Sequence, residues 1–490
     1  MRRRRAIRVI LYILAAFVLI VAGLFAYYKL ATKVHEPEID PSALASYERT
    51  ISGSSVNSCE HGWLKKERDG WWVMYLEGSP YEVGYAHGLL TQELMAAQEK
   101  AFLERLAELI PSKFYQRFML GFVRFFNRNL DQYVKEEYRQ EIYGISRFAS
   151  PEFGFMGPAY ARMLNYHAAH DLGHAVQNMN LVACTAFGVW DGRTPDSNLV
   201  IGRNFDFYVN DDFAKDKILC FIRPDSGYGF VMITWAGFAG VVSGMNEKGL
   251  TVTLNAAKSS IPGGAKTPVS LLAREILQYA ANIDEAGRIA ASRETFVAES
   301  FLVASAADHK AVVIEKTPED LAIYDPGADF IILTNHFQSD KFLNDQLNVE
   351  NMKNEVTVYR YDRVKELLEE NPVITPEIAA NILRDYRGLD GADIGMGEEK
   401  AINQFIAHHS VIFEPGKLRI WVSGQPWQLG EYWMYALDSL RNSAKPDESF
   451  TTGVHRVNTE GHGGGSTVIP ADTLLSSDVF REFLMKREEQ

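Results

Sequence analysis

The stretch that decides the fold runs from residue 183 to residue 207 and reads ACTAFGVWDGRTPDSNLVIGRNFDF. Two short apolar runs, residues 182–190 and 199–207, are rich in β-branched and aromatic residues, which is typical of strands. The segment between them, DGRTPDSN, is dense in turn-forming residues. The pattern therefore predicts a β-hairpin with Cys184, one of three cysteines in the chain, near its start.

The predicted hairpin brings charged side chains close to this cysteine. Folding it about the middle of its loop places Cys184 opposite Phe205, with Arg203 and Asp206 nearby, since facing residues lie roughly 5–8 Å apart. An arginine beside a thiol favours the reactive thiolate. Arg203 and Asp206 differ by three positions, so both reach the thiol only if the strand bends or ends near Asn204. A structural hairpin with a buried cysteine fits the same spacing.

The bulk composition is that of a globular protein. The chain has 490 residues, 47% hydrophobic and 23% charged, enough for one large domain or two to three ordinary ones. Its formal net charge of −13 argues against binding to nucleic acid. The sequence contains no H-E-x-x-H, G-x-S-x-G, P-loop or G-x-G-x-x-G motif, and no cofactor is expected.

The amino terminus has the pattern of a membrane anchor. A basic tail, residues 1–8, precedes twenty residues without a charge, residues 9–28, which is long enough for a transmembrane helix. The positive-inside rule places the tail in the cytoplasm and the rest outside, in the periplasm or the extracellular space. We favour an uncleaved signal anchor over a cleaved signal peptide, because no small-x-small cleavage site follows the run.

An extracytoplasmic location leaves two interpretations for the other cysteines. Cys59 and Cys220 could form a disulfide, which would leave Cys184 as the odd thiol. Cys220 lies in the apolar stretch KILCFIRP, and we favour a buried core position for it.

One cluster of histidines has the spacing of a metal site. The sequence YHAAHDLGHA places His167, His170, Asp171 and His174 on roughly one face of a helix. A polar helix face that forms hydrogen bonds near the site is the favoured interpretation, and we expect no metal.

Further motifs follow the hairpin in a fixed order. They are GMNEKGL and TVTLN (residues 244–255), LTNH (333–336), YRYDR (359–363), and SVIF and IWV (410–413 and 420–422). One more motif, GSPYEVG (78–84), lies upstream of the hairpin. Together with the hairpin, this order resembles N-terminal-nucleophile hydrolases of the choloylglycine hydrolase and penicillin acyltransferase type. The best match is the acyl-coenzyme A:6-aminopenicillanic acid acyltransferase family, also called the C45 peptidase family. The resemblance covers roughly residues 70 to 430.

The resemblance implies an α+β fold, a four-layer αββα sandwich of two antiparallel sheets. Residues 29–183 would form a helical pro-region, or small chain, and residues 184–490 the catalytic chain. The sequence after Cys184 fits, because strand-like runs alternate with helical stretches. The runs are Leu219–Ile222, Gly229–Trp235, Leu250–Leu254, Ala311–Glu315 and Phe330–Thr334, and the helical stretches are Pro268–Ala281 and Val356–Glu370.

The resemblance also implies that the chain cuts itself between Ala183 and Cys184. In such enzymes the nucleophile becomes the first residue of the mature chain, and its own α-amine is the general base. A terminal amine has a pKa of about 8, which suits this role near neutral pH. Relatives often carry glycine before the nucleophile, and the alanine here is also small.

Five further site residues are implied by their match to the family motifs. Arg203 would lower the pKa of the thiol, and Asp206 would hold the α-amine. Asn255 and Asn335 would donate hydrogen bonds to the oxyanion. Arg360 would anchor the carboxylate network.

The implied function is hydrolysis of the linear amide in a small N-acyl compound through a thioester acyl-enzyme. One alternative is an acyltransferase, in which an amine rather than water receives the acyl group. Another is a membrane-tethered binding protein without catalysis. The oligomeric state and the identity of the substrate stay open.

Overall fold

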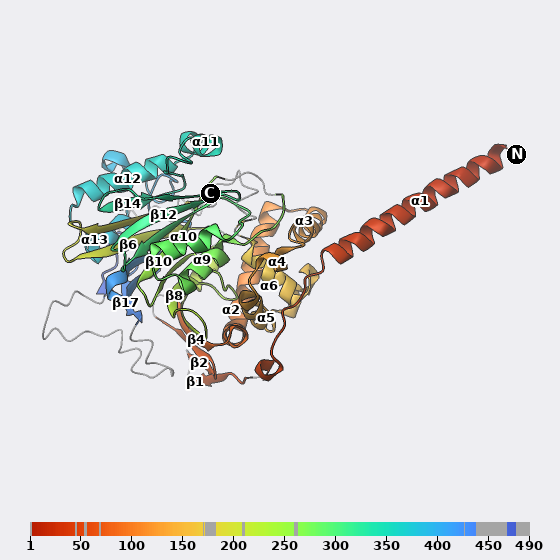
Figure 1. Ribbon diagram of the computed structural model, residues 1–490, viewed down its shortest axis with the longest axis horizontal. Helices are drawn as coiled ribbons and strands as arrows, with labels where there is room; N and C mark the ends of the chain where they lie inside the picture. Colours follow the sequence, from red (N-terminus) through yellow and green to blue (C-terminus); the bar gives the residue numbers. More distant parts are fainter. Residues whose placement is uncertain are drawn as a thin grey trace.

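The computed structural model describes residues 2–44, 47–52, 56–67, 70–169, 171, 183–207, 211–258, 263–425, 427–437 and 468–476. Two β-sheets and the helices on their outer faces form the body, from which one long helix projects (Figure 1). The fold is therefore mixed α and β, as the sequence predicts.

The larger sheet has eleven strands within the described residues, in the order β1-β2-β3-β4-β7-β8-β9-β10-β11-β12-β13. Neighbouring strands are antiparallel, except that β4 and β7 are parallel. The strands are β1 (Thr50–Ser52), β2 (Val56–Cys59), β3 (Gly62–Lys66), β4 (Trp72–Gly78), β7 (Ile218–Pro224), β8 (Phe230–Thr234), β9 (Ser243–Asn246), β10 (Leu250–Ala256), β11 (Glu299–Ser305), β12 (Lys310–Lys316) and β13 (Leu321–Tyr324).

The smaller sheet has seven described strands in the order β14-β5-β6-β15-β16-β17-β18, and all its pairs are antiparallel. These are β14 (Phe330–Leu333), β5 (Thr185–Asp191), β6 (Ser197–Asp206), β15 (Ala407–Glu414), β16 (Arg419–Ser423), β17 (Tyr432–Ala436) and β18 (Val468–Ile469). Each strand-like run predicted after Cys184 coincides with a strand of the two sheets to within one residue at either end of the run, or lies inside a longer strand.

Helices flank both sheets and form the outer layers (Figure 1). The α-helices are α1 (Arg2–Ala31), α2 (Pro80–Leu109), α3 (Lys113–Phe126), α4 (Leu130–Tyr133), α5 (Glu136–Ser146), α6 (Ala159–His167), α8 (Asp211–Lys215), α9 (Val269–Tyr279), α10 (Ile283–Ala291), α11 (Gln346–Asn354), α12 (Thr357–Glu370) and α13 (Pro376–Leu383). Short 3₁₀ turns are η1 (Pro41–Leu44), η3 (Pro151–Met156), η4 (Leu389–Gly391), η5 (Pro415–Lys417) and η6 (Thr473–Ser476).

Three apolar clusters define how these elements stack. One cluster lies between the inner faces of the two sheets, with Val73, Ile201 and Val411 among its members. A second joins the smaller sheet to α12 and α13, and a third joins the larger sheet to α2, α5, α9 and α10. The order of layers is therefore helices, sheet, sheet, helices.

The segment before Cys184 is more than the helical pro-region that the sequence predicts. It also supplies β1 to β4, and β4 pairs in parallel with β7, so that Trp72 faces Ile218. Such a pairing joins strands far apart in the sequence, and no local pattern reveals it. Helix α2 begins at Pro80, directly after Ser79.

The hairpin that the sequence predicts is present, and its register is correct. Thr185 faces Asn204 and Ala186 faces Arg203, which brings Cys184 opposite Phe205. Strand β6 does not end at Asn204. The neighbouring strand β15 instead contains a register shift opposite Phe205 and the residue after it, a bulge of the kind that redirects side chains.

Helix α1 contains a candidate membrane span, Ile7–Ala31, none of which is buried against the rest of the described chain. Length and composition alone identify it, and a signal sequence has the same properties. In Figure 1 α1 projects from the body, with α3 beside its inner end. The Tyr28 hydroxyl there donates a 3.0 Å hydrogen bond to the Gly121 carbonyl.

The motif GSPYEVG has a packing role that can be tested. A Cβ on Gly84 would collide with the backbone carbonyl of Glu141, where α2 crosses α5. We expect Gly84→Ala to destabilise the chain by about 1–3 kcal/mol, because backbone must move to make room. Thermal unfolding monitored by circular dichroism measures this as a lower midpoint.

The matched control is Gly154→Ala, where nothing lies within 4 Å of the added Cβ. Equal midpoints for Gly84→Ala and the control would contradict the tight crossing of α2 and α5.

Candidate active site

The thiol of Cys184 lies in the interior, with 1% of the residue exposed. The nearest charged group is the guanidinium of Arg203, whose Nη2 donates to Sγ at 3.6 Å. Burial raises the pKa of the Cys184 thiol to about 11, and the charge of Arg203 opposes that rise. In the uncut chain the thiol is therefore protonated at neutral pH, although Arg203 acts on it in the predicted direction.

Arg203 connects the two sheets beside this thiol. It belongs to β6 of the smaller sheet, yet it donates to the Leu254 carbonyl on β10 and, at 2.6 Å, to the Ser243 hydroxyl on β9. The whole residue is buried. Its contacts across the gap between the sheets hold the guanidinium in one place beside Cys184.

Two predicted residues hold the backbone of Cys184. Its N–H donates to Asn335 Oδ1 at 3.1 Å, and its carbonyl accepts from Arg360 Nη1 at 2.7 Å. Arg360 also donates to Asn335 Oδ1 at 2.7 Å, which links the two side chains. Arg360 comes from α12 and Asn335 follows β14, so the outer helical layer and the smaller sheet meet at Cys184.

The hydrogen bonds that Arg360 makes to the described residues differ from the predicted role in a carboxylate network. They go to Cys184, Asn335 and the Thr185 hydroxyl, and Arg360 influences Asp206 through its charge. Arg360 therefore contacts the backbone of Cys184 directly.

Asp206 is a buried carboxylate without a hydrogen-bonding partner among the described residues. Neither Oδ1 nor Oδ2 has one, although the Asp206 backbone carbonyl accepts from the Ala183 N–H at 3.2 Å. Burial raises the pKa of Asp206 from 3.8 to about 8, against the charges of Arg360 and Arg203. At neutral pH the Asp206 side chain is therefore mostly protonated, and a positively charged donor beside it would favour its carboxylate form.

Glu299 is a second buried carboxylate near the thiol, and sequence reasoning missed it. It begins β11 opposite Ala256, and neither of its carboxylate oxygens has a described partner. Burial raises its pKa well above the usual range, with Asp171 adding to the rise and Arg203 opposing it. An acid inside the otherwise apolar run FVAESFLVAS was the available signal.

Asn255 is close to the site but is already engaged. Its Nδ2 donates to the carbonyls of Leu333 at 3.2 Å and Thr334 at 2.9 Å. Both amide hydrogens are thereby used, so an oxyanion role would require Asn255 to change partners. Asn335 Nδ2 donates to the Ala256 carbonyl at 2.9 Å, which leaves its second amide hydrogen for a substrate.

Of the histidines in the predicted metal cluster, His167 lies within the described residues. Helix α6 ends at His167, whose Nδ1 lies 2.8 Å from the Met163 carbonyl and whose Nε2 accepts from Ala239 N–H. His170 and His174 lie outside the described residues. His167 is thus a satisfied interior histidine.

The free cysteines are Cys59, Cys184 and Cys220, so the disulfide between Cys59 and Cys220 is not formed. Cys220 is fully buried in the core, as the favoured interpretation predicts.

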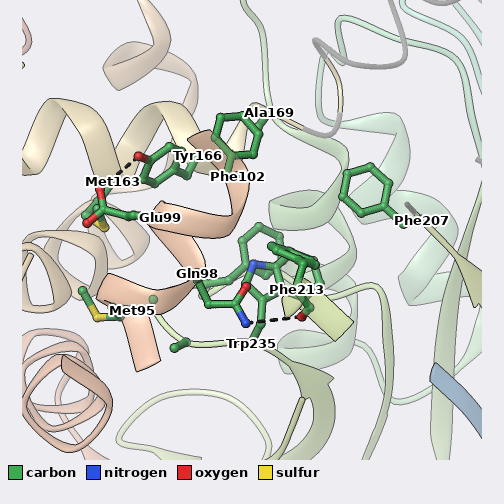
Figure 2. Close-up of a pocket in the computed structure, with 13 residues that line it drawn as sticks. Met95, Gln98, Glu99, Phe102, Met163, Tyr166, Ala169, Phe207, Phe213 and Trp235 are labelled. Atoms are coloured by element: carbon green, nitrogen blue, oxygen red, sulfur yellow. Dashed lines mark hydrogen bonds between the residues drawn. The ribbon is translucent and has the colours of Figure 1, made fainter. Parts of the chain in front are cut away.

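An apolar cavity lies beyond the end of β6 (Figure 2). Phe207, Phe213 and Trp235 form one side of it, and residues of α2 and α6 form the other. Its polar groups include Glu99, which accepts from the Tyr166 hydroxyl at 2.9 Å. Cys184 is not among its described lining residues, but Phe207 directly follows Asp206 and its ring stacks on Phe205.

Comparison with known families identifies the relationship. Residues 193–423 match the sequence model of the acyl-coenzyme A:6-aminopenicillanic acid acyl-transferase family. The family resemblance drawn from the sequence is thereby confirmed. The matched stretch includes the five predicted partners of the thiol and begins after Cys184.

Two curated relatives are similar to part of the chain. An uncharacterized protein from Archaeoglobus fulgidus is 28% identical over 253 residues, 47% of this chain and 41% of that protein. Protein dcd1B from Dictyostelium discoideum is 24% identical over 233 residues, 44% of each. The chain thus spans less than half the length of these relatives.

Solved structures with a partial likeness include three enzymes. The Caenorhabditis elegans ortholog of N-acylethanolamine-hydrolyzing acid amidase has a TM-score of 0.35 and 18% identity, over 48% of this chain and 93% of its own. A variant of conjugated bile acid hydrolase from Clostridium perfringens has a TM-score of 0.35 and 15% identity, over 52% of this chain and 93% of its own. Penicillin V acylase from Agrobacterium tumefaciens has a TM-score of 0.34 and 14% identity, over 52% of this chain and 86% of its own.

The buried carboxyl of Asp206 predicts a pH dependence of stability. The pKa of Asp206 is about 8 in the folded chain against 3.8 in the unfolded chain, so the folded chain binds this proton more tightly. The resulting contribution to the free energy of unfolding is fully present below the lower pKa and is lost as the pH rises to the higher one. Replacing Asp206 by Asn removes this decline, which amounts to at most about 1.4 kcal/mol per pH unit. Unfolding of the uncut Cys184→Ala chain, with and without Asp206→Asn, measures the difference.

Asp212→Asn, at an exposed carboxyl paired with Lys215, serves as the control and should leave the pH profile unchanged. If the Asp206→Asn profile ran parallel to that of its parent over this range, the buried ionisable group would be excluded as the cause.

Proposed function

We propose that this chain is a cysteine amidohydrolase of the N-terminal-nucleophile type, activated by cleavage between Ala183 and Cys184. The observation that carries the proposal is the set of contacts around one residue. Arg203 reaches the sulfur of Cys184, Asn335 its backbone nitrogen and Arg360 its carbonyl oxygen. A buried structural cysteine does not need such an arrangement, whereas a nucleophile that must be oriented does.

The unpartnered carboxylate of Asp206 supports cleavage. Cutting the bond before Cys184 would convert its amide nitrogen into an α-amine, which is cationic when protonated. The Ala183 N–H already donates to the Asp206 backbone carbonyl, so the new amine would form beside this residue. An ammonium there would supply the positive donor that Asp206 lacks in the uncut chain.

The cleavage itself needs no other reactant than water. The Cys184 thiol attacks the Ala183 carbonyl carbon, the carbon–nitrogen bond breaks, and the nitrogen takes up the thiol proton to become a free amine. The resulting thioester is hydrolysed, which leaves a carboxylate on Ala183 and restores the thiol. The products would be a small chain that ends at residue 183 and a catalytic chain, residues 184–490.

The mature site would then act on an N-acyl compound. The α-amine of Cys184 takes the thiol proton, sulfur attacks the acyl carbonyl, and the amine product leaves with that proton. Water hydrolyses the acyl-thioester. Asn335, with one amide hydrogen unused, would donate to the oxyanion, and Asn255 would do so after a change of partners. The apolar cavity beyond Phe207 suits an acyl chain.

Acyl transfer to an amine is the second candidate. The matched family is described as an acyl-transferase, which favours this outcome for the same thioester intermediate. Only the group that removes the acyl chain from sulfur differs between the two reactions.

We further propose that α1 anchors the protein in a membrane, with residues 1–8 in the cytoplasm, a span over residues 9–28 and the catalytic part outside. The apolar span and the basic cluster at its start support this orientation. Residues 29–183 would then stay joined to the anchor as the small chain.

The decisive experiment is intact mass and N-terminal sequencing of the purified full chain. We expect two chains, one beginning Cys-Thr-Ala-Phe, because the oriented thiol attacks its own preceding carbonyl. Cys184→Ala should stay whole, while Cys220→Ala, at a buried cysteine outside the site, should be cut normally.

A wild-type chain that remains whole and resists a thiol-reactive acyl probe would overturn the proposal and favour a binding protein without catalysis.

A further inference from the structure

Phe207 also lines a second cavity, of about 260 Å³. We call it the Lys217 cavity. Its wall includes the rings of Phe207, Phe405 and Trp427, and its polar lining residues are Asp211, Lys215, Lys217, His408, Gln425 and Gln428. Neither Lys217 nor His408 has a role in the cleavage chemistry above.

A chain of hydrogen bonds leads from the nucleophile's arginine to His408. Arg203 Nη1 donates to the Ser243 hydroxyl at 2.6 Å, and Ser243 Oγ lies 2.8 Å from His409 Nε2. His409 Nδ1 lies 3.0 Å from His408 Nδ1. The far end of this chain, His408 Nε2, is buried and has no partner among the described residues.

The direction of every proton in this chain follows from its first member. A guanidinium only donates, so the Ser243 hydroxyl accepts from Arg203 and gives its own hydrogen to His409 Nε2. A neutral His409 then carries its hydrogen on Nδ1 and donates it to His408 Nδ1. A neutral His408 must therefore carry its hydrogen on Nε2, where a donor without an acceptor remains.

Burial supports the neutral state of both rings. It lowers the pKa of His408 to about 3, helped by the charges of Lys217 and Arg203. It lowers the pKa of His409 well below the usual range in the same way. The assignment of hydrogens along the chain is thus self-consistent at neutral pH.

Lys217 provides a second donor group that lacks an adequate acceptor. The residue is 1% exposed, and its Nζ has one hydrogen bond within the described chain, at 3.4 Å to Gln428 Oε1. That oxygen also accepts from the Ser423 hydroxyl. Among the described residues no carboxylate pairs with Lys217, and a buried ammonium without a counter-charge is costly.

We propose that the Lys217 cavity binds a carboxylate, which pairs with Lys217 Nζ and accepts the Nε2–H of His408. The aromatic wall favours a carboxylate carried on an apolar body. Such a ligand would complete the hydrogen-bond chain that begins at Arg203, and so act on the thiol through the residue that contacts it. The carboxylate could belong to the substrate's amine half, which rests on the proposed amide hydrolysis, or to a free organic acid, which does not.

Binding is tested on the purified full chain by calorimetry with benzoate, and with benzamide as the uncharged analogue. We expect benzoate to bind and benzamide not to bind. Lys217→Met should weaken benzoate binding about tenfold or more, and Lys217→Arg should retain most of it. Lys316→Met, at another buried lysine on β12, is the matched control and should bind normally.

Lys217→Met should stay folded, because methionine fits a similar space and removes a buried charge. Its thermal midpoint without ligand should equal or exceed that of the parent. Equal binding of benzoate by the parent and Lys217→Met, or no binding by the parent, would overturn the proposal in favour of a cavity that holds only water.

Kinetics on the cut protein separate the two sources of the carboxylate. An N-acyl amino acid and the N-acyl amine with the same acyl group are compared. If the carboxylate belongs to the substrate, Lys217→Met raises KM for the N-acyl amino acid and leaves KM for the N-acyl amine unchanged. If the ligand is a free organic acid, added benzoate changes the rate of hydrolysis of both compounds. Benzoate binding without hydrolysis of either compound would reject the proposed function and keep the site.

Discussion

The buried guanidinium of Arg203 is the contact on which the rest of the site depends. It starts on the smaller sheet, reaches the backbone of the larger sheet at Leu254, and donates to the Cys184 sulfur. A buried cation costs free energy unless its hydrogen bonds are made, and those bonds also fix the separation of the two sheets at this point. The same side chain therefore contacts the Cys184 thiol and joins the two sheets of the sandwich.

Under the proposed cleavage, the described chain would be the precursor. Its thiol is held in place but protonated, and its nearby acid, Asp206, is buried without a hydrogen-bonding partner among the described residues. Burial raises the pKa of both groups. A single cut would add a cationic amine between them, which would favour the charged form of both groups. In this account the energetic cost of burying Asp206 is relieved only after cleavage.

Local patterns in the sequence predicted the strands and the hairpin that are formed by residues close together in the chain. The placing of Cys184 opposite Phe205 followed from the turn residues of one hairpin, and β10 contains the strand-like run predicted at Leu250–Leu254. The pairing of β4 with β7 joins segments far apart in the chain, which local patterns do not encode. The same limit applies to Glu299 and to the bonds from Arg203 to His409.

The family motifs also predicted that Asn335 and Arg360 belong to the site. These two residues come together at Cys184 because of how α12 packs over the smaller sheet. The motifs identified which residues gather around the thiol but not which atoms they contact. Asn255 illustrates the difference, because its amide hydrogens go to backbone carbonyls in the uncut chain. Contact partners depend on packing at the level of single atoms, and this level is decided by the folded chain as a whole.

The account's central claim, that cutting the chain activates this thiol, is tested most directly by the pH dependence of Cys184 alkylation. After iodoacetamide treatment and digestion, mass spectrometry separates peptides that begin at Cys184 from peptides that span residues 183 and 184, so cut and uncut chains are compared in one sample. The account predicts a midpoint near pH 11 in the uncut chain and a clearly lower one in the cut chain. The same midpoint in both would contradict it.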